Sequence, residues 1–526
     1  MILRRRGSVL YKTVRNITRM RYLSTDSTTV WEPTVGLEIH TQIATISKLF
    51  SKASTEFTSP VNSAVSLFDC AMPGTMPVLN KKCVEAGVLT ALALSCELNK
   101  ISMFERKHYF YADMPAGFQI TQQKKPLAVN GEISFYVFTP GIHKIPYLKT
   151  SQIKQIQLEQ DSGKSLHFEN AGKSLIDLNR AGIPLMELVF EPDLKDGEEA
   201  AALVKELCLI LEILGTSSCK MEEGALRVDA NVSVARQGNP LGTRTELKNI
   251  GSVRAVASAI KYEIERQIKI LDNGGTISNE TRMWDTIKNK TILMREKEER
   301  QDYRFMPETN LPPLYLNINE DVKNCPDVID VSLLETKIPS LPKDIRNDLL
   351  NRHGIPIRSA MALMSNAKIL NLFQTLSSKD TNRNSRALAN FILNEVLTFL
   401  NKYKLDISFC DDKMDFIGET FDLRNSRKIN AIVTTKVLDL LESGTKKTPQ
   451  EIINEHNWYL LSDEVELMQI CKDFLEKNGS KVEVYKNKVK KDKIFQSILG
   501  DVSLSVNRRA DIGVLSSVLR KILNES

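Results

Sequence analysis

An alternation of apolar and polar residues at positions 35–43 constrains the fold of this chain more than any other segment. Val35, Leu37 and Ile39 fall on one face of a strand, while Glu38 and His40 fall on the other, because successive side chains of a β-strand point in opposite directions. The apolar row can bury against a core, and the polar row presents a carboxylate beside an imidazole. On its own, the segment favours a half-exposed strand whose polar face meets solvent.

Carboxylates recur in comparable positions elsewhere in the chain. Asp229 lies in the alternating segment 227–234, Glu246 lies between two cations on one strand face, and Glu187 interrupts the apolar run 184–190. A carboxylate in an apolar run must be paired, protonated or bound to a metal. Several carboxylates and one imidazole directed into one cleft suit a hard divalent cation such as Mg²⁺.

Length and composition indicate a globular protein of two or three domains. The chain has 526 residues, too many for a single core, and its 42% hydrophobic and 26% charged residues are ordinary for a soluble protein. No apolar run approaches the ~18 residues that a membrane span requires. None of the eight cysteines forms a C-x-x-C pair, which argues against a structural zinc site or a disulfide framework and favours a reducing compartment.

The first 25 residues have the composition of a targeting segment. Residues 1–25 contain seven basic residues, and no acid precedes Asp26, which is typical of a mitochondrial transit peptide. We expect cleavage near residues 22–24. The alternative is a basic arm that stays on the mature protein and binds RNA.

The periodicity of apolar residues changes once in the rest of the chain, from strand-like to helical. Residues 30–325 mix alternating strands with helices and predict an α+β domain, whereas helical spacing takes over from about residue 330. We expect a helical domain over residues 330–450 and a helical tail domain over residues 451–526. In the tail, seven lysines lie between residues 477 and 493; they form either a phosphate-contacting RNA patch or a solvated face.

A phosphate-binding loop of the P-loop kind is excluded. Gly163, Lys164 and Ser165 resemble the end of such a loop, but the pattern needs glycine at position 158, which is Leu158. Residues 104–115 instead interleave basic and aromatic side chains. That mix can stack a base and hold a phosphate, or it can form the rim of a core.

Seven segments of the chain resemble, in order, motifs of the B subunit of glutamyl-tRNA(Gln) amidotransferase. They are residues 35–40, 73–80, 106–111, 179–187, 222–233, 246–249 and 302–305. The resemblance covers about residues 33–315, and the helical region beyond it resembles the family's tail more loosely.

The resemblance implies a mixed-sheet, cradle-like kinase and transamidase domain followed by an all-helical region that binds tRNA. In this family, ATP phosphorylates the side chain of glutamate esterified to tRNA(Gln) at a Mg²⁺-dependent site, and ammonia then displaces the phosphate to form Gln-tRNA(Gln). A glutaminase A subunit of the amidase family supplies the ammonia, and a small third subunit completes the complex. Together with the targeting segment, the resemblance places the protein in the mitochondrial matrix.

Elementary chemistry agrees with this division of labour. A carboxylate is a poor acceptor for ammonia, so phosphorylation supplies a leaving group, and that step needs charge neutralisation and positioning. The chain contains no recognisable glutaminase motif, neither a Gly/Ser-rich segment with a nucleophilic serine nor a cysteine nucleophile motif. A nitrogen-donating partner is therefore expected.

The resemblance also implies site residues. The catalytic residues carried over by motif are Glu38, His40, Glu187, Asp229 and Glu246, and the metal ligands are the same five with Gln160. ATP contacts are expected from Arg106, Lys107, Tyr111 and Lys164.

The chain departs from the family at two nearby positions. Gln157 and Gln160 stand where the family commonly has histidine and glutamate. A glutamine carbonyl can bind Mg²⁺ but brings no charge, so Glu159 could replace Gln160 as a ligand. These departures keep open a second function, a catalytically inert tRNA-binding scaffold. A third, an aminoacyl-tRNA synthetase, lacks that class's H-I-G-H and K-M-S-K-S signatures.

Overall fold

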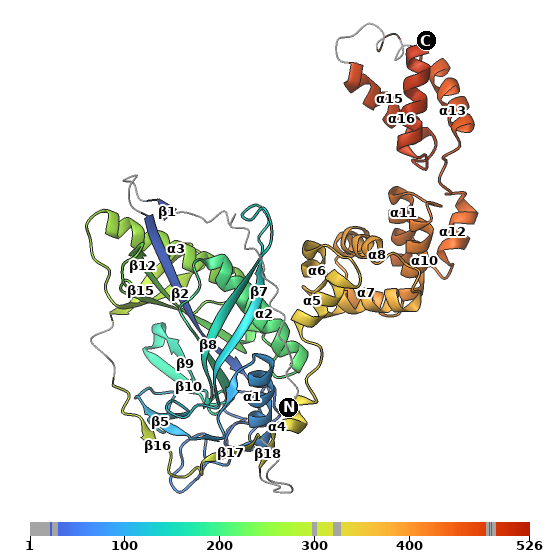
Figure 1. Cartoon of the computed structure of the whole chain (residues 1–526). Helices are drawn as coiled ribbons and strands as arrows, with labels where there is room; N and C mark the ends of the chain where they lie inside the picture. The colour runs from blue at the N-terminus through green and yellow to red at the C-terminus, as the bar shows by residue number, and fades with distance from the viewer. Residues whose placement is uncertain are drawn as a thin grey trace, which may run out of the picture. The chain divides into compact units, whose positions relative to one another are not determined.

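The chain forms two compact units, Met1–Lys343 (unit 1) and Asp344–Ser526 (unit 2), which are described separately below (Figure 1). The computed structural model describes residues 22–23, 30–296, 302–318, 328–479, 483, 485 and 491–525. The predicted transit peptide, apart from Tyr22–Leu23, and most of the lysine-rich stretch 477–493 lie outside the described residues.

Unit 1 is built on one large sheet with the strand order β15-β14-β13-β12-β2-β11-β8-β7-β3, and β1 (Tyr22–Leu23) pairs with β2. The strands are β2 (Val30–Gln42), β3 (Glu97–Leu98), β7 (Ala128–Val137), β8 (Tyr147–Gln160), β11 (Pro184–Phe190), β12 (Leu226–Arg236), β13 (Thr245–Lys248), β14 (Glu280–Asp285) and β15 (Lys290–Glu296). Neighbouring strands are antiparallel except β13 and β14, which are parallel. The predicted mixed sheet is confirmed.

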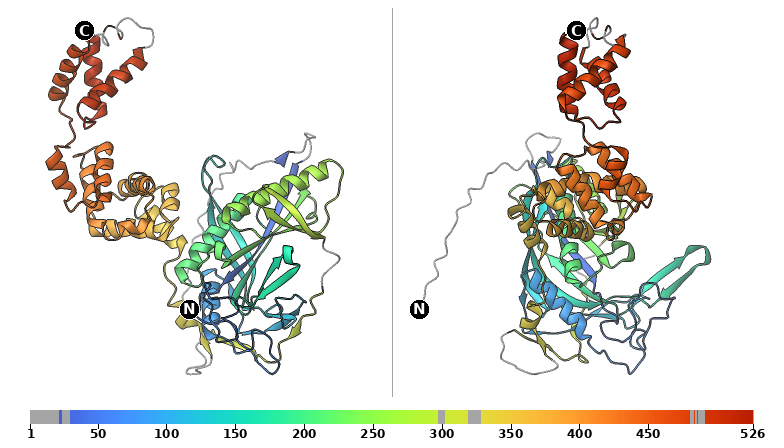
Figure 2. Two further views of the ribbon diagram at one scale, coloured as in Figure 1. Left: turned by 180° about the vertical axis from the view of Figure 1, so that it is seen from behind. Right: turned by 90° about the vertical axis from the view of Figure 1, so that its right-hand side faces the viewer.

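Three helices cover one face of this sheet: α1 (Lys81–Ala93), α2 (Gly197–Leu214) and α3 (Val253–Asp272) (Figure 2). Ile39, Leu188 and Val228 belong to the buried core that these helices share with the strands. Helices α2 and α3 approach closely at Gly197, where an added Cβ would lie 2.3 Å from the carbonyl oxygen of Ala257. Since side chains alternate along a strand, the neighbours of the core residues face the opposite side of the sheet.

Three small sheets border the large one in unit 1. They are the hairpin β9 (Lys164–Phe168) with β10 (Lys173–Asp177), the sheet of β16 (Met306–Pro307), β5 (Glu105–His108) and β6 (Phe118–Thr121), and the sheet of β18 (Ile329–Asp330), β17 (Leu314–Asn317) and β4 (Ile101–Ser102). Short helical turns η1 (Glu169–Ala171) and η2 (Met221–Glu223) and helix α4 (Val331–Glu335) complete the unit.

The described residues of unit 2 form helices joined by loops, with one isolated β-bridge between Leu461 and Ala510, which confirms the all-helical C-terminal region. Its elements are α5 (Pro342–Asn351, which begins at the end of unit 1), α6 (Ile357–Leu363), α7 (Ala367–Lys379), α8 (Ser385–Phe391), η3 (Ile392–Val396), α9 (Leu397–Tyr403), η4 (Ile407–Cys410), α10 (Met414–Asn425), α11 (Ala431–Glu442), α12 (Pro449–His456), α13 (Glu464–Lys477), α15 (Lys491–Ser505) and α16 (Ile512–Glu525). Helix α12 begins with a capping box, because the Thr448 side chain accepts from the Glu451 N–H while the Glu451 side chain accepts from the Thr448 N–H.

The core of unit 2 is divided. One apolar cluster spans helices α5–α11, a second joins parts of α10, α11 and α12, and a third is formed by α13, α15 and α16 with the residues between them. Among the described residues of the whole chain, none of the helices has the length and hydropathy needed to cross a membrane.

Candidate active site

The polar face of the large sheet carries a ladder of functional side chains at the centre of unit 1. His40 on β2 is opposite Glu187 on β11, and Glu187 is opposite Gln157 on β8. On the other side of β2, Arg227 of β12 is opposite His40, and Asp229 is opposite Glu38. The alternating pattern predicted the polar face of each strand. The register of the strands brings these polar residues together, although they are widely separated in the sequence.

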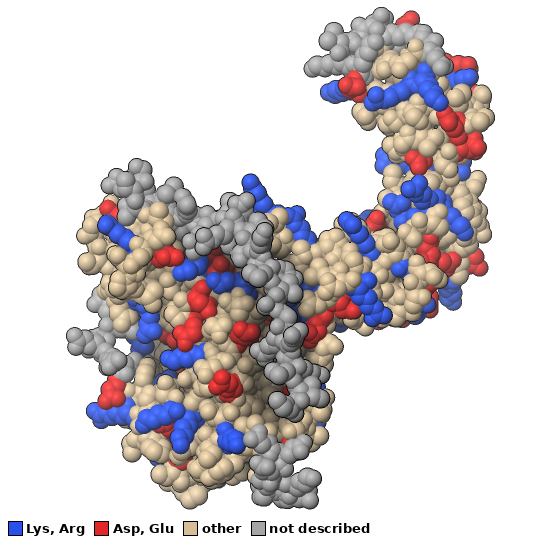
Figure 3. All heavy atoms as spheres, viewed as in Figure 1, with Lys and Arg blue, Asp and Glu red and all other residues tan. Residues whose placement is uncertain are grey.

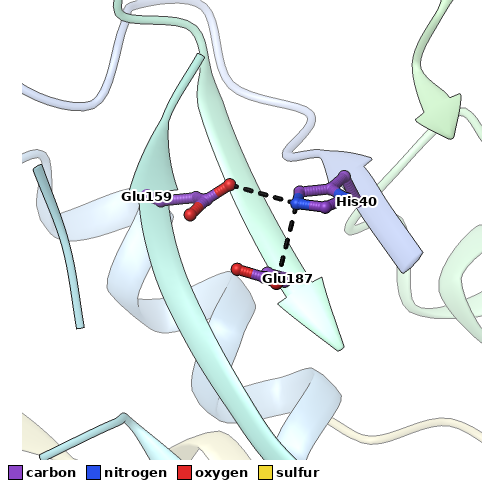
Figure 4. Close-up of side chains that lie close together, drawn as sticks. All are labelled: His40, Glu159 and Glu187. Atoms are coloured by element: carbon purple, nitrogen blue, oxygen red, sulfur yellow. Dashed lines mark ion pairs between the residues drawn. The ribbon is translucent and has the colours of Figure 1, made fainter. Parts of the chain in front are cut away.

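His40, Glu159 and Glu187 form a tight cluster on this face (Figure 4). The Nε2 atom of His40 lies 3.3 Å from Oε1 of Glu159 and 3.7 Å from Oε1 of Glu187. One ligand atom from each residue lies within 4.8 Å of the other two, and within the described parts of the chain this is the group of three such residues that could hold a metal ion. Both glutamates are buried, and the imidazole is half-buried.

The carboxylates of the cluster favour positive charge between them. Burial alone would lower the pKa of His40, but Glu187, Glu159 and Asp229 outweigh it and raise that pKa to about 9. Burial and the neighbouring Glu159 carboxylate raise the pKa of Glu187 to about 7. The pKa of Glu159 falls to about 2, because the contact with His40 and the charge of Lys107 outweigh its burial.

The donor set fits a hard divalent cation. Two carboxylate oxygens and one imidazole nitrogen provide part of a coordination shell, and a Mg²⁺ ion normally keeps several waters beside one or two carboxylates. The two like charges that repel each other in the free cluster would both be neutralised by such an ion.

The structure brings Glu159, and not Gln160, to His40. Alternation along β8 puts Gln157 and Glu159 on the polar face with Glu187. Gln160 lies on the opposite face of the strand and lines a separate cavity. Gln157 contacts the cluster through a hydrogen bond, since its Nε2 donates to Oε2 of Glu187 and, at 3.2 Å, to Oγ1 of Thr121. The sequence analysis considered Glu159 only as a replacement for Gln160. The two-residue spacing between Gln157 and Glu159 could have shown that both lie on the same strand face.

Asp229 and Glu246 form a second charged group beside the cluster. Lys248 Nζ lies 2.5 Å from Oδ2 of Asp229 and 3.2 Å from Oε1 of Glu246. Burial would lower the pKa of Lys248, but these two carboxylates outweigh it and raise that pKa. Glu38 accepts a hydrogen bond of 3.0 Å from Nδ2 of Asn231. Three of the five predicted catalytic residues are thus outside the His40 cluster: Glu38, Asp229 and Glu246. The sequence had placed Lys248 beside Glu246 on one strand face, but it did not show the contact of Lys248 with Asp229.

The predicted ATP-contacting residues lie in different surroundings. Lys107 is close enough to Glu159 and Glu187 for its charge to lower the pKa of both, and its Nζ lies 4.9 Å from the ring centre of Tyr303. Arg106 is held by Glu308 through two bonds of 2.6 and 2.9 Å. The remaining two residues are exposed: Tyr111, whose ring meets that of Tyr109 edge-on at 5.6 Å, and Lys164, which begins β9.

A cavity of about 330 Å³ lies at the end of β8, with Gln160 in its wall. Its wall includes Asp69, Arg106, Gln160, Asp161 and Glu308. Asp161 is fixed by Arg227, whose Nη2 lies 2.7 Å from Oδ2 of Asp161, so the ladder on β12 also shapes the cavity wall. In the space-filling view, acidic side chains lie among basic ones on the exposed face of unit 1 (Figure 3).

The fold and the site together define a protein with an α+β unit that carries a cluster of potential metal ligands, and with an all-helical second unit. Comparison with known families makes this specific: residues 33–322 match the GatB/GatE catalytic domain, and residues 371–523 match the GatB domain. The chain belongs to the GatB family, the B subunits of tRNA-dependent amidotransferases.

Relatives resemble the chain over almost its whole length. The B subunit of the mitochondrial glutamyl-tRNA(Gln) amidotransferase of Aedes aegypti is 50% identical over 495 residues, covering 94% of this chain and 93% of that protein. The human protein of the same name is 44% identical over 94% of this chain and 89% of its own length. The B subunit of the aspartyl/glutamyl-tRNA(Asn/Gln) amidotransferase of Rickettsia typhi is 37% identical over 96% of this chain and its entire length.

Proposed function

We propose that this chain is the subunit that activates and amidates glutamyl-tRNA(Gln), using ATP and Mg²⁺ and ammonia from a partner glutaminase. The observation that carries the proposal is the intact His40, Glu159 and Glu187 cluster in a chain of the GatB family. The names of the mitochondrial relatives support glutamyl-tRNA(Gln) as the substrate.

The reaction balances in two steps. A side-chain carboxylate oxygen of the tRNA-bound glutamate attacks the γ-phosphorus of ATP, and the bond from phosphorus to the bridging oxygen of ADP breaks. The nitrogen of ammonia then attacks the acyl carbon, phosphate leaves with the electron pair of its C–O bond, and the nitrogen loses a proton. Both steps gather negative charge, so positioned positive charge is the main requirement of the site.

The residues of the chain divide this work. His40, Glu159 and Glu187 would hold Mg²⁺, which supplies charge neutralisation for the phosphates when bound. Lys107 adds a positive charge next to the same carboxylates, which supports its role in binding ATP. Lys248 is oriented by Asp229 and Glu246, which supports a role for these carboxylates in positioning a cation rather than in ligation.

The remaining proposed ATP contacts have weaker structural support. Arg106 forms an ion pair with Glu308, and both residues line the cavity. This pairing supports a role for Arg106 in fixing the cavity wall. Tyr111 is exposed beside Tyr109 and is available for stacking, and Lys164 is an exposed cation on the β9–β10 hairpin.

The family name implies partners, since a B subunit belongs to a larger assembly. We propose a glutaminase A subunit of the amidase family, a small third subunit and glutamyl-tRNA(Gln) as the partners of this chain, with the helical unit binding the tRNA. The mitochondrial relatives and the basic residues 1–25 support a mitochondrial location, in the matrix.

ATP turnover by the assembled complex tests the proposal. Hydrolysis should require Mg²⁺, should rise on addition of glutamyl-tRNA(Gln), and should be lost in the His40→Ala complex while tRNA binding is retained. If the wild-type complex binds tRNA but shows no tRNA-dependent ATP turnover, the chain is instead an inert tRNA-binding scaffold, which the glutamines at 157 and 160 would then explain.

A further inference from the structure

Arg227 is a charged residue on the polar face of the large sheet that lies outside the cluster of potential metal ligands. It belongs to β12, which lies beside β2 in the sheet, and the register sets it directly opposite His40 (Figure 1). Directly opposite residues of antiparallel strands have Cβ atoms about 5 Å apart, so the side chain of Arg227 leaves the sheet next to the imidazole. Alternation along β12 puts Arg227 on the same face as Asp229.

Two arginines hold the buried carboxylate of Asp161, and they differ in what else they bind. Nη2 of Arg227 lies 2.7 Å from Oδ2 of Asp161, Nε of Arg180 lies 3.6 Å from it, and each arginine side chain is 36% exposed. Arg180 also donates to the backbone carbonyls of Ser162, at 3.0 Å, and Gly163, at 2.5 Å. Within the described residues, the guanidinium of Arg227 makes no hydrogen bond besides the one to Asp161, and its buried Nε has no partner. Arg180 is thus occupied by the fold, whereas Arg227 keeps donors for another group.

Arg227 is paired less completely than Lys248, the neighbouring cation on this face. Two carboxylates hold Lys248, at 2.5 and 3.2 Å, whereas Arg227 is hydrogen-bonded to one carboxylate and shares it with Arg180. Burial alone would lower the pKa of Arg227, but the charges of Asp161 and Glu159 raise it, so the guanidinium stays charged. A buried N–H without a partner costs free energy, which a bound acceptor would recover.

The chemistry of the guanidinium indicates an oxyanion as the ligand. Its N–H groups form a planar fork that matches two oxygens of a carboxylate or a phosphate. The proposed reaction brings both kinds of group together, the side-chain carboxylate of the tRNA-bound glutamate and the phosphates of ATP. These anions repel each other, and Glu159 and Glu187 add negative charge beside His40. A carboxylate has two oxygens, so one can accept a hydrogen bond from Arg227 while the other attacks the γ-phosphorus.

We propose that Arg227 binds the reacting oxyanion of the substrates, either the glutamyl carboxylate or the phosphoryl group that is transferred to it. This inference rests on the proposed function, because it takes both anions to meet on this face of the sheet. Arg227 is then a substrate-binding residue beside the metal ligands. Asp161 is a positioning residue, since its carboxylate orients the guanidinium through Nη2.

Arg227→Met in the assembled complex tests the inference. The matched control is Arg180→Met, which removes the other arginine that holds Asp161 and has the same exposure. Kd values are measured in the presence of Mg²⁺ for glutamyl-tRNA(Gln), for uncharged tRNA(Gln) and for a non-hydrolysable ATP analogue. We expect Arg227→Met to bind glutamyl-tRNA(Gln) or the ATP analogue at least about tenfold more weakly, because a hydrogen bond between charged groups is lost. Arg180→Met should bind all three ligands normally.

The ligand that loses affinity identifies the source of the oxyanion. Weaker binding of glutamyl-tRNA(Gln), with uncharged tRNA(Gln) and the ATP analogue unchanged, assigns Arg227 to the glutamyl carboxylate. Weaker binding of the ATP analogue alone assigns it to the phosphoryl group. Arg227→Lys keeps the charge but not the planar fork, so it should recover only part of the lost affinity.

Two outcomes would overturn the inference: Arg227→Met binds every ligand as well as Arg180→Met does, or it weakens uncharged tRNA(Gln) as much as glutamyl-tRNA(Gln) and leaves the ATP analogue unaffected. If Arg227→Met does not assemble, the double variant Arg227→Met with Asp161→Asn is compared with Asp161→Asn alone, and equal Kd values contradict the inference.

These binding measurements are independent of turnover. If the wild-type complex shows no tRNA-dependent ATP hydrolysis, the proposed function fails, while the Kd values still decide whether Arg227 binds an oxyanion.

Discussion

His40 and Glu159 are 119 positions apart in the sequence, yet Nε2 of the histidine lies 3.3 Å from Oε1 of the glutamate on one face of the central sheet. Glu187 lies on the strand between them, opposite His40 in the ladder. This contact makes Glu159 a candidate ligand in place of Gln160, which the family resemblance had implied, and it changes which substitutions should affect Mg²⁺ dependence.

Glu159→Gln should abolish Mg²⁺-dependent chemistry. Removing one of two carboxylates from a three-residue cluster takes away a charged ligand, and we expect tRNA-dependent ATP turnover to fall by at least about 100-fold at fixed Mg²⁺. The measurement is ATP turnover against Mg²⁺ concentration on complexes of verified stoichiometry. Unchanged Mg²⁺ dependence would remove Glu159 from the ligand set.

Gln160→Glu at the adjacent position should be tolerated and should leave the Mg²⁺ dependence unchanged. The side chain at position 160 lies on the other face of β8, so the added carboxylate does not face His40. The same Mg²⁺ titration provides the test. A clear shift toward lower Mg²⁺ concentration would show that Gln160 does reach the metal, as the family resemblance implied.

Asp229→Asn and Glu246→Gln should each abolish tRNA-dependent ATP hydrolysis and amide formation. Either change leaves Lys248 with one counter-charge in place of two, and so alters both the position and the field of that cation. Because the amides are isosteric, assembly and basal glutamine hydrolysis by the partner should survive. The exposed carboxylate variant Glu222→Gln is the control. Near-normal amidation by both variants would make the two carboxylates structural.

The lysine-rich stretch of the tail should contact tRNA phosphates. Replacing four of its lysines with glutamine should weaken tRNA binding and reduce the slope of log affinity against log salt by about 0.7–0.9 for each phosphate interaction that is removed. Binding would be measured across a salt series. The control replaces four exposed lysines of unit 1: Lys52, Lys100, Lys124 and Lys125. An unchanged slope would assign the tail lysines to a solvated surface.

The mature protein should begin between about Tyr22 and Val30. Seven basic residues without an acid before Asp26 predict import and cleavage of the leading segment. Sequencing the N-terminus of protein purified from mitochondria provides the measurement. Recovery of the intact Met1 end would instead support a retained basic arm.

Local patterns in the sequence determined most of the fold. The period-two alternation around Glu38 and His40, and again around Asp229, predicts strands with one polar face, and both strands are present with that face. The capping box at Thr448 and Glu451 and the helical spacing beyond residue 330 likewise depend on neighbours within a few positions. Such features are set by backbone sterics and local hydrogen bonds, so they can be predicted from the local sequence alone.

Only the tertiary structure decided which polar residues meet. Strand order puts β11 between β2 and β8, and the register sets Glu187 opposite both His40 and Gln157, which brings Glu159 to the imidazole. A slip of one residue along β8 would have presented Gln160 instead, because each position reverses the face. The contact of Lys248 with Asp229 was hidden for the same reason, although spacing within one strand had already placed Lys248 beside Glu246. Lateral contacts depend on long-range strand pairing, which is fixed by burial of the whole core and not by spacing within one segment.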